Sequence, residues 1–135
     1  MHRREGKLIV AATDLVGFLA CGHLTRLDRA HVAGLLPKPD RKDDPTLELL
    51  RRRGGLHEER YIELLEANGR EITNLRHERL EDGRDPRPYA DRAAETIAHM
   101  RAGDDVIYQA TVFDGQWVGH PDFLRRTTGA SALGT

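Results

Sequence analysis

The fold is decided by residues 106–119, which read VIYQATVFDGQWVG. Residues 106–113 (VIYQATVF) alternate and are rich in β-branched and aromatic residues, which predicts one strand. Asp114-Gly115 then forms a pair typical of a two-residue turn, after which the chain returns through residues 116–119. The sequence therefore predicts a β-hairpin within residues 105–124. Because two strands alone are marginally stable in water, we expect further strands beside it.

Helical patterns precede the hairpin. Residues 44–69 begin with Asp44-Pro45, a favourable N-cap and first helical residue, and end at an Asn-Gly pair that stops helices. Residues 89–102 show a second helical spacing of apolar residues. Residues 1–36 read as a short strand followed by a helical entry, with Thr13 as the expected N-cap. Helices around a hairpin indicate an α/β fold.

The long helix carries a stripe of residues at steps of three and four. Its members are Leu50, Gly54, His57, Tyr61, Leu64 and Asn68. Because this spacing follows the helical period, we expect His57 to face inward with the apolar residues. Gly54-Gly55 weakens the middle of the helix, so we expect a kink, a break or a close neighbour there.

Length and charge restrict the class of protein. A chain of 135 residues has the size of one domain. Its 21 basic and 22 acidic residues nearly balance, which excludes a basic nucleic-acid tail and an acidic disordered tail. The single cysteine cannot close an intrachain disulfide, and no apolar run approaches the ~20 residues of a membrane span. We therefore expect a cytoplasmic protein with no membrane role.

Three side chains carry the expected chemistry. His57 and Glu58 lie on the long helix, and Asp122 follows the hairpin. An imidazole together with carboxylates can hold a hard divalent cation, Mg²⁺ or Mn²⁺, with positions left for water. Such a cation activates water for phosphodiester hydrolysis. We expect His57 and Asp122 as metal ligands that lie close together, with Glu58 as a further catalytic residue.

Each of these residues also has a purely structural interpretation. His57 can be a hydrogen-bonded core residue. Glu58 can be a surface residue, because adjacent helical residues point about 100° apart. Asp122 stands where the alternation places a buried residue, which requires a partner for its carboxylate, or it is a turn residue that bonds its own backbone. Zinc is disfavoured because the histidines and the one cysteine lack ligand spacing.

Four segments resemble one known family in order and spacing. They are residues 12–23 (ATDLVGFLACGH), 54–61 (GGLHEERY), 106–110 (VIYQA) and 119–124 (GHPDFL). Together they are similar to the RecB-like nucleases of the PD-(D/E)xK superfamily, over nearly the whole chain. The resemblance implies a restriction-endonuclease-like core with helices packed on a mixed sheet. It also implies that His57, Asp122 and a later acidic residue bind the metal, and that a later (Asp/Glu)-x-Lys motif completes the site.

The resemblance further implies that residues 1–135 are the N-terminal portion of one nuclease domain, ending before the strand of that third motif. The last lysine of the chain is Lys42, so the lysine of the motif is not among these residues. We therefore expect a metal-dependent DNA nuclease, present here as an incomplete and inactive fragment. The alternative is a non-catalytic nucleic-acid-binding or interaction module with the same fold. The sequence has no phosphate-binding loop, so any helicase or ATPase partner domain lies outside this chain.

Basic residues and the cysteine complete the expectations. A nearly neutral nuclease must gather its phosphate contacts locally, so we expect Arg51, Arg52, Arg125 and Arg126 at the rim of the site. Some relatives use an early cysteine, similar in place to Cys21, with later cysteines to hold an iron–sulfur cluster. This chain has no later cysteine, so a cluster is unsupported and we expect Cys21 to be a buried, small apolar residue.

Overall fold

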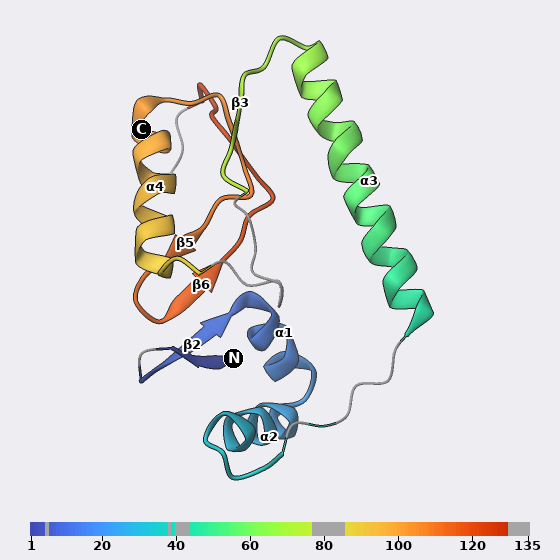
Figure 1. The fold of residues 1–135 in the computed structure, drawn as a ribbon, viewed down its shortest axis with the longest axis vertical. Coiled ribbons are helices and arrows are strands. Elements are labelled where there is room, and N and C mark those ends of the chain that lie inside the picture. Colours follow the sequence, from blue (N-terminus) through green and yellow to red (C-terminus); the bar gives the residue numbers. More distant parts are fainter. Residues whose placement is uncertain (5, 38, 40–43, 77–85, 130–135) are drawn as a thin grey trace.

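The computed structural model describes residues 1–4, 6–37, 39, 44–76 and 86–129. Within these ranges the protein is mixed α/β, as the sequence predicts, with helices beside two small sheets (Figure 1). The helices are α1 (Ala12–Ala20), α2 (Gly22–Val32), α3 (Pro45–Ala67) and α4 (Tyr89–Ala102). The strands are β1 (His2–Arg4), β2 (Lys7–Ala11), β3 (Ile72–Asn74), β4 (Val106–Tyr108), β5 (Val112–Phe113), β6 (Trp117–Gly119) and β7 (Phe123–Arg125).

The predicted turn at Asp114-Gly115 is confirmed. Strands β5 and β6 pair antiparallel on either side of it, with Phe113 opposite Val118. The Asp114 carboxylate accepts hydrogen bonds from the backbone N–H groups of Gln116 (2.9 Å) and Trp117 (2.7 Å). Gly115 takes the positive φ (+104°) that such a turn requires. This hairpin joins a four-stranded sheet in the order β1-β2-β6-β5, in which β2 and β6 are parallel.

The expectation of one long strand over residues 106–113 is wrong. The segment breaks after Tyr108, and its two halves belong to different sheets. Strand β4 lies at the centre of a three-stranded sheet, parallel to β3 and antiparallel to β7. The break falls at Gln109, whose φ of +56° cannot continue a strand. The range 105–124 therefore contains the hairpin and, flanking it, the β4–β7 pair.

Helix α3 confirms the long helix predicted for residues 44–69. Asp44 caps it by accepting hydrogen bonds from the N–H groups of Thr46 (2.9 Å) and Leu47 (3.4 Å), with Pro45 at the first helical position. The helix ends at Ala67 with Asn68 as its C-cap, and Gly69 follows with a φ of +73°. It runs without a break through Gly54-Gly55, and a Cβ added to either glycine would meet nothing within 4 Å. The expected kink, break or close neighbour is therefore absent within this helix.

Replacing Gly54 and Gly55 with alanine is expected to stabilise the protein. Alanine loses less backbone entropy in a helix, about 1 kcal/mol for each exchange, and both positions have room for the added methyl group. The free energy of unfolding, measured by urea titration, should rise by roughly 2 kcal/mol in the double variant. Gly34→Ala is the matched contrast, because Gly34 has a φ of +77° and alanine is strained there. A double variant no more stable than wild type would contradict a continuous α3.

The N-terminal segment follows the predicted order of strand and helices, with two corrections. The N-cap of α1 is Ala11, not Thr13, and Asp14 supplies the capping carboxylate by accepting from the Ala11 N–H (2.7 Å). Burial alone would raise the pKa of Asp14, but its bonds to the N-terminal ammonium and to Ala11 hold that pKa below its usual value. Cys21 is exposed in the extended link between α1 and α2, so the expectation of a buried cysteine is also wrong. The helical residues on both sides of Cys21 are exposed as well.

The core gathers on the three-stranded sheet. Its central strand β4 is buried along its whole length, and Ile107 packs there with Leu75, Ala110 and Leu124. Helices α4 and α3 lie on opposite sides of these strands (Figure 1). On the α4 side, the fully buried Thr96 hydroxyl accepts a hydrogen bond from the Thr111 N–H (3.0 Å). None of the helices in the described ranges combines the length and apolar character needed to cross a bilayer.

Candidate functional site

The face that α3 turns toward the sheet is shifted by one residue along the sequence from the predicted stripe. Leu65 is buried on this face, and Glu58, Tyr61 and Ile62 are half-buried. His57 is exposed, so the expectation that it faces inward is wrong. The predicted stripe counted Leu50 and Leu64, whose side chains are 60% and 56% exposed. Because neighbouring helical residues point about 100° apart, this shift turns Glu58 inward and leaves His57 beside it toward solvent.

Aromatic rings dock α3 on the sheet. The Tyr61 ring meets the Phe123 ring of β7 edge-on, with centroids 4.9 Å apart and planes at 87°. On β4, the Tyr108 ring lies 5.0 Å from the same Phe123 ring. Both separations are in the favourable range for aromatic pairs, worth about 0.5–1.5 kcal/mol each beyond their buried area. These contacts fix the side of α3 that bears Glu58 against the ends of β4 and β7.

Glu58 is held by two consecutive residues of the sheet. Its Oε2 atom accepts hydrogen bonds from the Tyr108 hydroxyl (2.7 Å) and from Nε2 of Gln109 (3.3 Å). Burial, together with the hydrogen bond to Glu58, raises the pKa of Tyr108, so the phenol remains a proton donor at neutral pH. The Glu58 carboxylate therefore has a set position although it comes from a separate helix.

Asp122 lies at the same point of the fold. It immediately precedes β7, and its Oδ1 atom accepts a hydrogen bond from Nε2 of Gln109 (3.2 Å). Of the two alternatives for Asp122, the buried carboxylate is wrong, because the residue is exposed. The alternation of β7 starts only at Phe123, so residue 122 lies outside the strand and is not bound by its pattern. One amide nitrogen thus bonds carboxylates from two elements that are 64 positions apart in the chain.

This donor set suits a hard divalent cation in part. Mg²⁺ is commonly bound by one or two carboxylates, with water and substrate phosphate filling its other positions. Glu58 and Asp122 are two such carboxylates, and Asp122 is exposed to solvent. Among the residues the structure describes, no group of three His, Cys, Asp or Glu side chains could hold a metal ion. The geometry therefore joins Glu58 to Asp122, and it does not bring His57 in with them as a third ligand.

The arginines of the predicted rim separate into two groups. Arg125 lies on β7 opposite Val106, at the end of this strand pair away from Asp122, and its Nη1 atom donates to the Tyr61 hydroxyl (3.4 Å), one turn beyond Glu58. Arg126 follows it and lies 4.0 Å from Asp105. Arg51 is exposed and pairs with Glu48 at 3.8 Å. It stands seven residues before Glu58 and so shares its side of the helix, whereas the exposed Arg52 points elsewhere.

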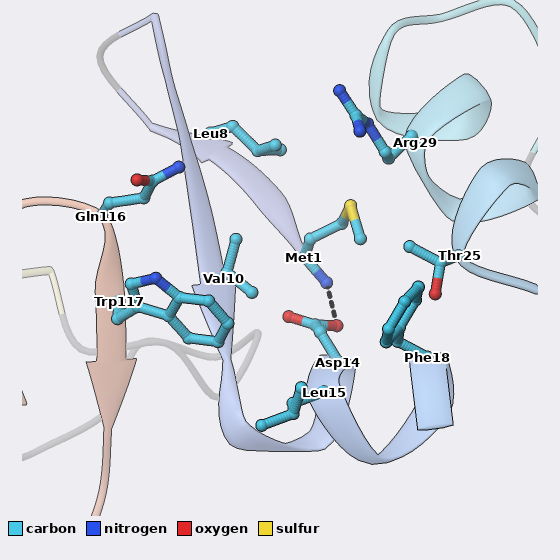
Figure 2. A pocket seen from close by; sticks show the side chains of 10 residues that line it. All are labelled: Met1, Leu8, Val10, Asp14, Leu15, Phe18, Thr25, Arg29, Gln116 and Trp117. Carbon is cyan, nitrogen blue, oxygen red and sulfur yellow. Dashed lines mark hydrogen bonds and ion pairs between the residues drawn. The ribbon is translucent and has the colours of Figure 1, made fainter. Parts of the chain in front are cut away.

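A separate pocket of about 310 Å³ lies between the N-terminal strands, α1, α2 and β6 (Figure 2). None of the predicted site residues lines it. Its lining is largely apolar, with Leu15, Phe18 and Trp117 prominent, and its carboxylate is that of Asp14 (Figure 2). The Asp14 carboxylate already bonds the N-terminal ammonium and the Ala11 amide. The Asp14 carboxylate is therefore already bonded, so the pair Glu58 and Asp122 is the stronger candidate for a cation site.

Comparison of the chain with protein-family models, with curated proteins and with solved structures found no match.

Two residues of the site were not predicted to act there. Tyr108 and Gln109 belong to the predicted strand, in which consecutive side chains point to opposite faces. Both nevertheless donate to the same Glu58 oxygen. A polar glutamine inside the run VIYQATVF was the available sign that this strand is interrupted.

Proposed function

We propose that residues 1–135 contribute part of the active site of a metal-dependent nuclease that hydrolyses phosphodiester bonds of DNA. The observation that carries the proposal is the pair of carboxylates, Glu58 and Asp122, held by a single glutamine amide at the solvent-facing end of the small sheet. The resemblance to RecB-like nucleases supports it, because the four similar segments include both residues. A restriction-endonuclease-like core and a cytoplasmic location belong to the same proposal.

Glu58 and Asp122 would hold Mg²⁺ or Mn²⁺ in this site. A bound cation of this kind polarises a phosphoryl group and lowers the pKa of an attacking water. The Tyr108 hydroxyl orients the Glu58 carboxylate. The contact between the Tyr61 and Phe123 rings sets the distance between α3, which carries Glu58, and the sheet. Arg125 and Arg51 flank the pair and are the proposed contacts for DNA phosphates. His57 remains in the proposal as an exposed imidazole beside Glu58.

The proposal separates cation binding from cleavage. Hydrolysis of this type also needs a cationic group beside the attacking water, and no lysine follows Lys42 in the sequence. We therefore expect residues 1–135 to bind the cation without cleaving DNA. The acidic residue and lysine of the third motif, and any helicase or ATPase partner, would come from outside these residues. A module that binds DNA through its arginines but binds no cation is the competing function, and the next experiment distinguishes the two.

Titration of the metal-free protein with Mn²⁺, followed by calorimetry, tests the proposal. Glu58→Gln and Asp122→Asn are each expected to weaken Mn²⁺ binding by more than about 10-fold, because each removes a charged ligand while keeping its shape. The matched controls are Glu59→Gln, on the next exposed residue of α3, and Asp91→Asn, on the exposed first turn of α4. Both controls should bind as wild type does. Equal affinity in all four variants, or no binding by the wild type, would contradict the proposed site.

A further inference from the structure

Gln109 has a backbone conformation that its residue type rarely adopts. Its φ of +56° is the single positive value among the described non-glycine residues, and all the others belong to glycines. The left-handed region is unfavourable for a side chain with a Cβ atom, so the surrounding structure must offset its cost. Residues held in this way cluster at functional sites.

The backbone around Gln109 is bonded on the β7 side. The Gln109 N–H donates to the Asp122 carbonyl (2.8 Å), and the Ala110 N–H donates to the Pro121 carbonyl (3.1 Å). These bonds extend the β4–β7 pairing past the last strand pair, Tyr108 opposite Phe123. Backbone hydrogen bonds alone therefore connect residue 109 to the segment that carries Asp122.

The left-handed turn explains how the side chains meet. In a regular strand, Tyr108 and Gln109 would point to opposite faces of the sheet. With residue 109 left-handed, the Tyr108 hydroxyl and the Gln109 amide both reach Oε2 of Glu58, at 2.7 Å and 3.3 Å. The same Gln109 Nε2 atom reaches Oδ1 of Asp122 at 3.2 Å. Two carboxylate oxygens that would repel each other are therefore bonded by one and the same donor nitrogen.

We propose that Gln109 is a positioning residue that sets the spacing of Glu58 and Asp122 for the cation. This inference rests on the proposed function and adds to it the group that keeps the two carboxylates together while no cation is bound. The Gln109 amide donates to both carboxylates, at 3.3 Å and 3.2 Å, and hydrogen bonds to ionised acceptors are stronger than neutral ones. Gln109 is half-buried, one residue beyond the end of β4.

A first test uses no metal. The sequence contains only four side-chain amides, at Asn68, Asn74, Gln109 and Gln116, so their NH₂ resonances can be assigned one by one. Glu58→Gln and Asp122→Asn should each shift the Gln109 NH₂ resonances of the metal-free chain and leave those of Gln116 in place. Gln109 resonances that respond to neither variant would overturn the inference, whatever the protein does with metal.

A second test compares Gln109→Leu with Gln116→Leu, the same exchange at an exposed residue of the hairpin. Gln109→Leu is expected to weaken Mn²⁺ binding about 10-fold or more, as loss of a group that orients metal ligands typically does, while the thermal midpoint stays close to that of Gln116→Leu. If Gln109→Leu binds Mn²⁺ as tightly as Gln116→Leu while Glu58→Gln and Asp122→Asn lose binding, the positioning role is wrong and the proposed function stands. If the two carboxylate variants bind as wild type does, the proposed function fails, and the resonance test still decides whether Gln109 bridges the carboxylates.

Discussion

Replacing Asp122 with alanine should abolish DNA cleavage in a protein that joins residues 1–135 to a strand bearing the acidic residue and lysine of the third motif. The Asp122 carboxylate faces solvent and is held at one oxygen by Gln109, so it remains open to a cation. Loss of a group that merely orients a metal ligand typically costs about 10- to 100-fold in activity, and loss of the ligand itself should cost at least about 100-fold. Cleavage of a labelled DNA duplex in the presence of Mg²⁺ or Mn²⁺ measures the effect.

His57→Ala in the same protein should reduce cleavage less than Asp122→Ala. His57 is exposed, and water replaces a neutral imidazole more readily than it replaces a charged ligand. Glu59→Gln serves as the control, because Glu59 is exposed and its neighbour Glu58 carries the contacts to the sheet. Robust metal-dependent cleavage by residues 1–135 alone, surviving Asp122→Ala, would show that the chemistry lies on other residues.

Thr96→Val should lower the free energy of unfolding by about 2 kcal/mol, although it changes neither the size nor the shape of the side chain. The Thr96 side chain is fully buried, at 0% exposure. Its hydroxyl donates to the Arg92 carbonyl (3.1 Å) and accepts from the N–H of the buried Thr111 (3.0 Å). Valine leaves that N–H unpaired inside the protein, which costs about 1–3 kcal/mol. For a domain whose whole stability is about 5–15 kcal/mol, this loss is large.

Urea unfolding followed by circular dichroism measures the change. Thr13→Val is the matched control, because Thr13 is an exposed helical threonine, and its free energy of unfolding should stay within about 0.5 kcal/mol of the wild-type value. Superposable unfolding curves for Thr96→Val and wild type would mean that Thr96 does not anchor α4 to the strand segment at Thr111.

The elements that could be predicted from the sequence are those specified by local chemistry. Asp44-Pro45 marks the start of α3 because a carboxylate cap and a proline are favourable there whatever the rest of the chain does. Gly103 marks the end of α4 by taking a φ of +82°. The Asp114-Gly115 turn likewise depends only on neighbouring residues.

The elements that could not be predicted depend on distant partners. The face of α3 that turns inward is selected by Phe123 and Tyr108, which lie in strands far along the chain. Leu50 and Leu64 suggested another face, but no described strand covers them and both are exposed. The break at Gln109 likewise exists because β4 and β5 belong to different sheets. Sequence periodicity alone cannot distinguish a continuous strand from two strands that diverge.

The candidate site was predicted in part. The sequence predicts Asp122 as a metal ligand and Glu58 as a catalytic residue, and the structure brings both to Gln109. His57 lies on the face of α3 that the sequence predicts to point inward, and this prediction is wrong because His57 is exposed. Gln109 itself could not be assigned a role, because its contact with both carboxylates requires a left-handed conformation that glutamine seldom adopts.

The most direct test of the central claim, that Glu58 and Asp122 together hold a divalent cation, is the location of bound Mn²⁺ in the ¹⁵N-labelled chain. Mn²⁺ is paramagnetic and broadens the amide resonances of nearby residues. We predict that substoichiometric Mn²⁺ broadens first the resonances around Glu58, Gln109 and Asp122. The acidic pair Asp104-Asp105 should be spared, since Asp104 bonds Thr73 and His99 and Asp105 bonds Arg70 at 2.8 Å. Broadening centred on Asp104-Asp105 or on Asp14, with the Gln109 resonances unchanged, would contradict the claim.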